Sequence, residues 1–90
     1  MIMGQRKDLS EREACVILAL LKPGIHSYQS LCNAGRCSKT EAVRAIVKAI
    51  HLGAEAGYYS NGWSLYAPPK VLTNIHRETN KILCRSGRPV

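Results

Sequence analysis

The sequence predicts a small, mainly α-helical domain with one β-hairpin and an added C-terminal helix. Three observations predict this class. In two segments, a helix start signal precedes apolar residues that are spaced as in one face of a helix. In a third segment, apolar and polar residues alternate around an Asn-Gly pair. The C-terminal segment carries apolar residues three and four positions apart. The predicted order is three helices, a hairpin and a final helix.

The composition limits the class of protein. Ninety residues suffice for one domain with a modest core. Thirteen lysines and arginines oppose six acidic residues, so the formal net charge is +7, which serves solubility or favours nucleic acid as a partner. No apolar run reaches the roughly 18 residues of a membrane span, and the N-terminus lacks a signal-peptide pattern. We therefore expect a cytoplasmic protein that does not contact the membrane.

The first helix is expected to start close to residue 9, after a flexible basic N-terminus at residues 1–8. Ser10 and Glu13 form a capping box. The run ACVILALL that follows contains no polar side chain. Because a small domain has little protein to cover such a helix on all sides, we expect a second subunit to supply part of the cover.

The next two helices are predicted at 28–34 and 38–52. Ser27 caps the first, and Gly35 is expected to end it. A second capping box starts the longer helix, and Gly53 stops it. Its broad apolar arc holds Ala42, Val43, Ala45, Ile46, Val47, Ala49, Ile50 and Leu52. Its polar sector holds Thr40, Glu41, Arg44, Lys48 and His51. A short helix, a turn containing glycine and a longer helix make a helix-turn-helix arrangement.

A β-hairpin is predicted over 54–68 around the turn Asn61-Gly62. The turn pairs Ser60 with Trp63, Tyr58 with Leu65, and Ala56 with Ala67. The face expected to pack on the helices carries Ala56, Tyr58, Trp63, Leu65 and Ala67. Hairpin packing explains Tyr58 and Trp63 at least as well as base stacking on single strands does.

The last helix is predicted over 68–86, followed by a tail at 87–90. It carries a narrow apolar seam at coiled-coil spacing. Packing on the same chain and pairing with a second copy both remain open, and we favour pairing. The expected homodimer interface combines residues of the first and last helices: Ile17, Leu20, Leu72, Ile75, Thr79 and Ile82.

The four cysteines match no disulfide scaffold and no zinc motif. Cys32 and Cys37 with His26 or His51 are conceivable metal ligands, but no CxxC or HxxxH pair accompanies them. Reduced, partly buried thiols are favoured, and neither a metal nor a cofactor is expected. Whether Cys84 bonds to its twin across a dimer axis stays open.

Residues 9–67 resemble the winged helix-turn-helix superfamily in the order of their predicted elements. The best match is GRCSKTEAVRAI at 35–46. It is similar to the Gly-x-Ser-x-x-Thr-Val-x-Arg-Ala segment of small bacterial, archaeal, phage and plasmid regulators and of replication-protein DNA-binding segments. The chain departs from that pattern by one extra residue between Gly35 and Ser38, and by Ala42 where Val is usual. The resemblance implies a protein that binds double-stranded DNA sequence-specifically.

The resemblance also implies roles for individual residues. Side chains near the start of a helix in the major groove read base edges. The expected base readers are Lys39, Thr40, Glu41 and Arg44. The expected phosphate contacts are Arg36, Ser38, Lys48 and His51. The hairpin tip has no Arg or Lys, so any contact there falls to Tyr59 and Asn61.

A homodimeric transcriptional regulator is the favoured function. One alternative is a plasmid or phage replication or segregation factor that uses the same DNA-binding surface. The other is a winged-helix module that grips a protein instead of DNA. An enzyme is not expected, because the sequence has no Gly-rich phosphate loop, no metal cluster and no nucleophile with a base at readable spacing.

Overall fold

The computed structural model describes residues 9–85. The predicted flexible N-terminus at 1–8 and the predicted tail at 87–90 lie outside the described residues. The elements, in chain order, are α1 (Glu11–Leu20), α2 (Tyr28–Gly35), α3 (Lys39–His51), β1 (Glu55–Tyr59), β2 (Gly62–Tyr66) and α4 (Pro69–Arg85). This order confirms the mainly helical class with one antiparallel hairpin. None of the helices between residues 9 and 85 is both long enough and apolar enough to span a membrane.

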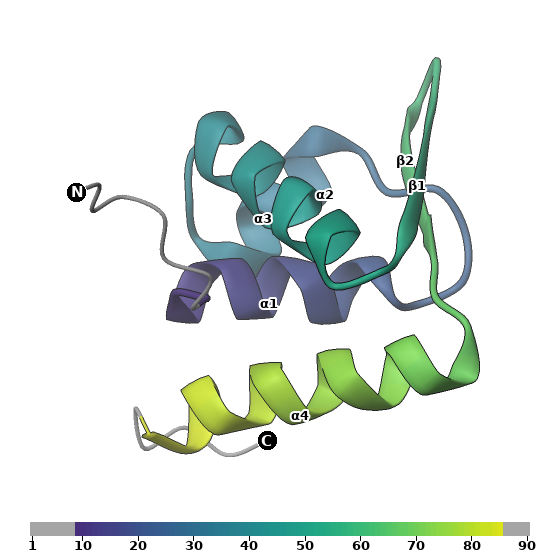
Figure 1. Cartoon of the computed structure of the whole chain (residues 1–90). Coiled ribbons are helices and arrows are strands. Elements are labelled where there is room, and N and C mark those ends of the chain that lie inside the picture. The colour runs from purple at the N-terminus through teal and green to yellow at the C-terminus, as the bar shows by residue number, and fades with distance from the viewer. Residues whose placement is uncertain (1–8, 86–90) are drawn as a thin grey trace, which may run out of the picture.

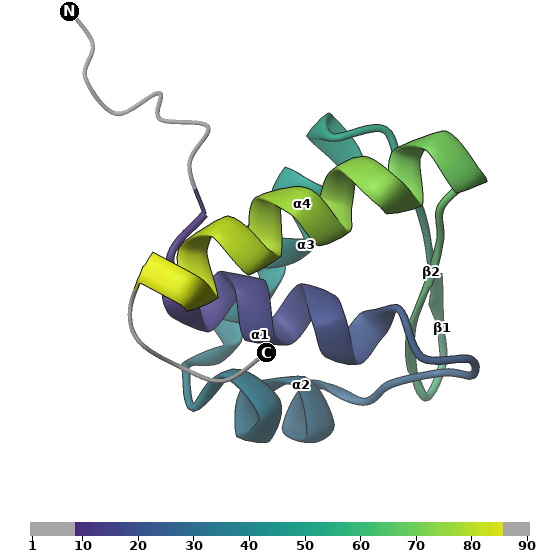
Figure 2. The ribbon, with the colours of Figure 1, turned by 90° about the horizontal axis from the view of Figure 1, so that it is seen from below.

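Helix α1 forms the centre of the molecule. Figure 1 shows α3 on one side of α1 and α4 on the other, and Figure 2 shows α2 alongside it. Val16, Ile17 and Leu20 are almost completely buried, and they share one core with Leu31 of α2 and Ile46 of α3. The chain itself thus covers Ala14, Val16, Ile17 and Leu20, while the other four side chains of the run are half-buried. That a second subunit supplies part of the cover stays a prediction.

Helix α4 packs back on α1 (Figure 2). Ile75 and Thr79 have no exposed surface. The buried Thr79 hydroxyl is satisfied within its helix, because it donates to the Ile75 carbonyl at 3.0 Å. The apolar seam predicted for the last helix is therefore present in α4, but it packs against the same chain.

This packing removes most of the predicted dimer interface. Ile17, Leu20, Ile75 and Thr79 are between 0 and 1% exposed. Their assignment to contacts with a second copy is wrong, because side chains enclosed by their own core have no surface to offer. Leu72 and Ile82 are half-buried. Dimerisation itself stays a prediction.

The hairpin pairs two residues out of the predicted register. The observed pairs include Tyr59 with Gly62, Tyr58 with Trp63, and Ala56 with Leu65. The turn is therefore Ser60-Asn61 and not Asn61-Gly62. A shift by two positions preserves the alternation of side chains, so the predicted division of the hairpin into two faces still holds.

His26 is joined to the hairpin through Trp63. It exchanges two backbone hydrogen bonds with Trp63, of 2.7 and 2.8 Å, and so forms a one-residue bridge to the hairpin. A Cβ at position 62 would collide with the His26 carbonyl, and Gly62 also has a φ of 145° that side chains rarely adopt. Glycine is needed where the two backbones meet, which places Gly62 within the strand.

Candidate nucleic-acid interface

Helix α3 is supported along its whole length by small side chains. Ala42, Ala45 and Ala49 have no exposed surface, and Ile46 is only 1% exposed. Positions three and four apart lie on the same face of a helix. Because alanine is small, this face lies close to the core, while the opposite face of α3 stays open to solvent.

The start of α3 is capped as predicted. The Ser38 hydroxyl accepts the Glu41 backbone N–H at 3.2 Å, and the Glu41 carboxylate accepts the Ser38 backbone N–H at 3.1 Å. This backbone hydrogen bond, helped by the Arg12 guanidinium, lowers the pKa of Glu41 below its ordinary value. Ser38 and Glu41, both predicted to contact DNA, are thus engaged with the helix end.

Two ion pairs connect α1 to α3. Arg12 lies 3.4 Å from Glu41, and Lys48 Nζ lies 2.7 Å from the Glu13 carboxylate. The Glu13 side chain is only 8% exposed and that of Lys48 is 28% exposed, so this second pair is shielded from water. Lys48 therefore turns toward α1, away from the position that a phosphate contact requires. Glu13 was read from the sequence only as a capping residue, and nothing local in the sequence pairs it with Lys48.

Four residues make an exposed strip along the solvent side of α3. Thr40, Arg44, Val47 and His51 follow one another at intervals of four, three and four, and all are exposed. We call these four the outward stripe. Lys39 is exposed beside its first turn. The structure thus brings together four of the ten residues predicted for DNA contact: Lys39, Thr40, Arg44 and His51.

The solvent-facing side of α3 is rotated from the predicted one. Val47 and Ile50, assigned to the apolar arc, are each 43% exposed. Glu41 and Lys48, assigned to the open sector, are half-buried. The ion pairs with α1 cause this difference, because they hold one edge of the polar sector against the core and leave the opposite, aliphatic edge outside.

The turn between α2 and α3 differs from the prediction by one residue. Gly35 does not end α2, because the helix includes it and Arg36 follows with φ 52° and ψ 50°. Gly35 is buried, and a Cβ there would come within 2.6 Å of the Val16 side chain and 2.9 Å of the Arg12 carbonyl. Glycine is therefore needed for the close approach of α2 to α1, and the left-handed position falls to Arg36.

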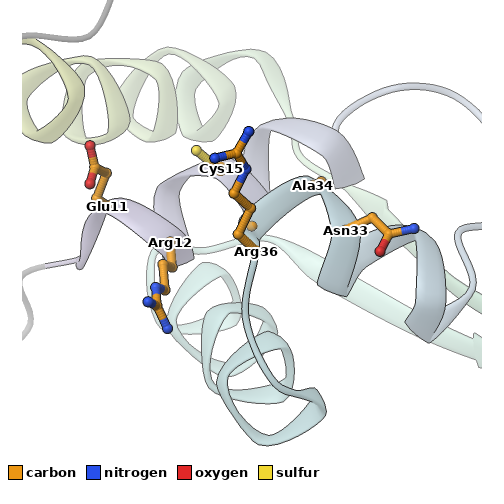
Figure 3. A pocket seen from close by; sticks show the side chains of 7 residues that line it. Glu11, Arg12, Cys15, Asn33, Ala34 and Arg36 are labelled. Carbon is orange, nitrogen blue, oxygen red and sulfur yellow. The ribbon is translucent and has the colours of Figure 1, made fainter.

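Arg36 lines an open hollow of about 490 Å³ between α1 and the end of α2. Figure 3 shows its side chain reaching across α1 toward Cys15, whereas Arg12 points the other way, toward α3. The guanidinium of Arg36 therefore lies away from the outward stripe. The structure does not bring this predicted phosphate contact together with Arg44.

An aromatic cluster joins the start of α2 to the hairpin. The rings of Tyr58 and Trp63 have centroids 4.9 Å apart, and that of Tyr28 lies 6.3 Å from Tyr58. Lys39 Nζ lies 4.4 Å from the centre of the Tyr28 ring, a cation–π contact. The Lys39 ammonium therefore lies beside this cluster, through which the start of α2 contacts the hairpin.

The hairpin projects beyond the helices (Figure 1). Tyr59 and Asn61, both predicted to contact DNA, are exposed at its tip. On its outer face, Tyr59 and Tyr66 border a shallow hollow of about 220 Å³ whose lining includes Gly57 and Ser64. The tip therefore exposes the hydroxyl group of Tyr59 and the side-chain amide of Asn61, as the sequence predicts.

The cysteines show no metal-binding arrangement. Among residues 9–85, no three His, Cys, Asp or Glu side chains gather in a way that would hold a metal ion. Among residues 9–85 no disulfide joins the four cysteines, and of the four only Cys84 is exposed. Burial, with Cys32 and Glu41 nearby, raises the pKa of the Cys37 thiol. A raised pKa keeps this thiol protonated and unreactive near neutral pH.

Comparison with known proteins yields no relative. No protein-family model matches the chain, and neither a curated protein nor a solved structure matches it. Its function is therefore inferred from the chemistry of the surface around α3.

Proposed function

We propose that this protein is a winged helix-turn-helix protein that binds double-stranded DNA sequence-specifically by inserting α3 into the major groove. The observation that carries the proposal is the outward stripe. It lies on a helix whose opposite face is held by the core and by two ion pairs. A helix supported in this way presents its open side without rearrangement, as binding in a groove requires.

The dimensions suit such a contact. The major groove of B-DNA is about 12 Å wide, and an α-helix with its side chains is about 10–12 Å across. The outward stripe runs along α3 from its first turn to its last residue, and the hairpin projects beside it. Groove insertion therefore leaves the hairpin close to the neighbouring DNA backbone.

The proposed roles follow from the placement of each side chain. Arg44 is exposed in the second turn of α3, where its guanidinium can donate two hydrogen bonds to one guanine edge. Thr40 is assigned to a base edge, and His51 and Lys39 to phosphates. Glu41 and Lys48 are assigned to support of the helix, because both are engaged in ion pairs with α1.

The charge of the chain supports an anionic partner. The net charge is +7. Glu13, Glu41 and Glu78 are already paired with basic side chains. Phosphate contacts by the remaining basic residues would supply sequence-independent affinity, and base contacts by α3 would supply selectivity.

A transcriptional regulator is the proposed biological role. A replication or segregation factor of the plasmid or phage type would use the same surface, so the site alone favours neither over the other. Dimerisation would have to use surfaces other than the enclosed residues of α1 and α4.

A protein-binding module is the second candidate. The observation in its favour is the apolar surface on and near α3: Val47 and Ile50 are each 43% exposed and Tyr58 is 59% exposed. Salt separates the two candidates. Duplex binding weakens steeply as salt rises because counterions are released, whereas an apolar protein contact depends much less on salt.

The direct test is selection of bound sites from a random duplex pool, followed by affinity measurements at several salt concentrations. We expect Arg44→Ala to lower affinity for the best site by about 1–3 kcal/mol and to relax the preference at one base pair. Arg77→Ala is the matched control, because Arg77 is exposed on α4, on the far side of α1. It removes the same charge and should leave base preference unchanged.

Two results would contradict the proposal. One is a selected pool without any shared sequence, combined with binding that is insensitive to salt. The other is equal loss of affinity and unchanged preference in Arg44→Ala and Arg77→Ala, since the two variants would then differ from the parent only in net charge.

A further inference from the structure

The outward stripe contains one side chain that cannot form a hydrogen bond. Val47 lies between Arg44 and His51 and is 43% exposed. The core face of α3 is complete without it, since Ala42, Ala45, Ile46 and Ala49 fill that face. Val47 is therefore not needed to complete the core. Its aliphatic side chain lies in the middle of the outward stripe.

The position of Val47 relates it to Arg44. Three residues of α-helix advance about 4.5 Å along the axis, at about 1.5 Å per residue. Base pairs in B-DNA are about 3.4 Å apart. If Arg44 reads one base pair, Val47 lies about one step further along the groove.

The chemistry of the groove limits what Val47 can contact there. Every base shows hydrogen-bond donors or acceptors on its major-groove edge, and among the four bases thymine alone carries a methyl group there. An aliphatic side chain placed against a donor or acceptor removes water from it and supplies no partner, which is costly. Against the thymine methyl, the same side chain buries two apolar groups.

We propose that Val47 is a specificity-determining residue that selects a thymine through its 5-methyl group, next to the base pair read by Arg44. This inference rests on the proposed function of α3. A protein-docking role for Val47 is less favoured, because Val47 lies between a basic residue and a histidine on the exposed side of α3. Neither hollow described above includes a residue of α3.

The experiment replaces each thymine of the selected site, one at a time, with deoxyuridine. Deoxyuridine keeps every hydrogen-bonding group and lacks only the methyl. For the parent protein, we expect one position to lose about fourfold in affinity, the effect of one buried methyl group. In Val47→Ala, deoxyuridine and thymine should bind equally well at that position.

Ile50→Ala is the matched control. Ile50 is exposed to the same extent on α3 but lies outside the outward stripe. This variant should keep the parent's sensitivity to deoxyuridine. Thermal melting of both variants checks that each remains folded at the temperature of the assay.

The outcomes separate the inference from the proposed function. An absence of sequence-selective duplex binding refutes the proposed function. Selective binding in which no deoxyuridine weakens the complex overturns only the role of Val47. So does a deoxyuridine effect that persists in Val47→Ala, which would assign the methyl contact to another side chain. Unchanged duplex binding by Val47→Ala at every position also overturns it and favours docking of a protein on this side chain.

Discussion

The ion pair between Lys48 and Glu13 provides the sharpest test of how α3 is held. The Glu13 carboxylate is nearly buried, and it also accepts the Ser10 backbone N–H at 2.8 Å. In Lys48→Ala that carboxylate keeps its hydrogen bond but loses a counter-charge 2.7 Å away. We expect the variant to be less stable than the parent, with little change in DNA affinity.

The burial of the two partners sets the size of the effect. Removing one partner of a fully buried ion pair costs about 3–5 kcal/mol, and losing a hydrogen bond to a charged group about 1.5–3 kcal/mol. Because the Lys48 side chain remains 28% exposed, the lower range applies, and we expect a loss of about 2 kcal/mol. For a domain of this size that lowers the Tm by about 8–16 °C.

Urea and thermal denaturation measure this loss, and duplex titration well below the lowered Tm measures binding. Arg44→Ala is the opposite case, because it removes an exposed side chain and should change stability by no more than about 0.5 kcal/mol. The double variant Glu13→Gln/Lys48→Met should be more stable than Lys48→Ala, because no unpaired charge remains. A Lys48→Ala protein as stable as the parent, yet weaker on every DNA sequence, would refute the structural role and restore a phosphate contact.

Three further predictions concern the core, the hairpin and acid stability. Ile75→Ala should lower the free energy of unfolding by about 2–5 kcal/mol in urea denaturation; unchanged stability with a halved mass in light scattering would instead place Ile75 between subunits. Gly62→Ala should cost about 1–3 kcal/mol and speed hydrogen exchange at the His26 amide, whereas an unchanged exchange rate would contradict the close contact of the two backbones. Because the folded-state pKa of Glu41 is lowered, its contribution to stability is complete above its ordinary value of 4.5 and is lost as the pH falls through the folded-state pKa. Glu41→Gln should therefore lose less stability than the parent between pH 7 and strongly acidic pH, and identical pH profiles would refute this.

Features whose partners lie close in sequence were predictable. The capping boxes at Ser10 and Ser38 each join residues three positions apart, and both are present as predicted. The faces of the hairpin follow from strict alternation. Its register does not follow from alternation, because a shift by two positions leaves both faces unchanged. The contact of His26 with Gly62 and Trp63 was likewise hidden, since these residues lie far apart in sequence.

The open side of α3 was only partly predictable for the same reason. Lys48 lies at one edge of the polar sector and Val47 borders its other edge from the apolar arc, and the period of the helix permits either side to face the core. The choice is made by Glu13, 35 residues before Lys48. Likewise, the spacing of the seam in α4 fits packing on α1 and packing on a second copy equally well. Only the position of α4 in the folded chain distinguishes them.

The position of α4 has a practical consequence for handling the protein. Figure 1 shows α4 and α3 on opposite sides of α1. Cys84 is exposed near the end of α4, while the other three cysteines are half-buried. A maleimide-coated sensor surface or a thiol-reactive dye would therefore couple preferentially at Cys84, with α3 directed away from the point of attachment. The native sequence thus supplies a handle for oriented immobilisation, and no tag is needed to keep the helix accessible.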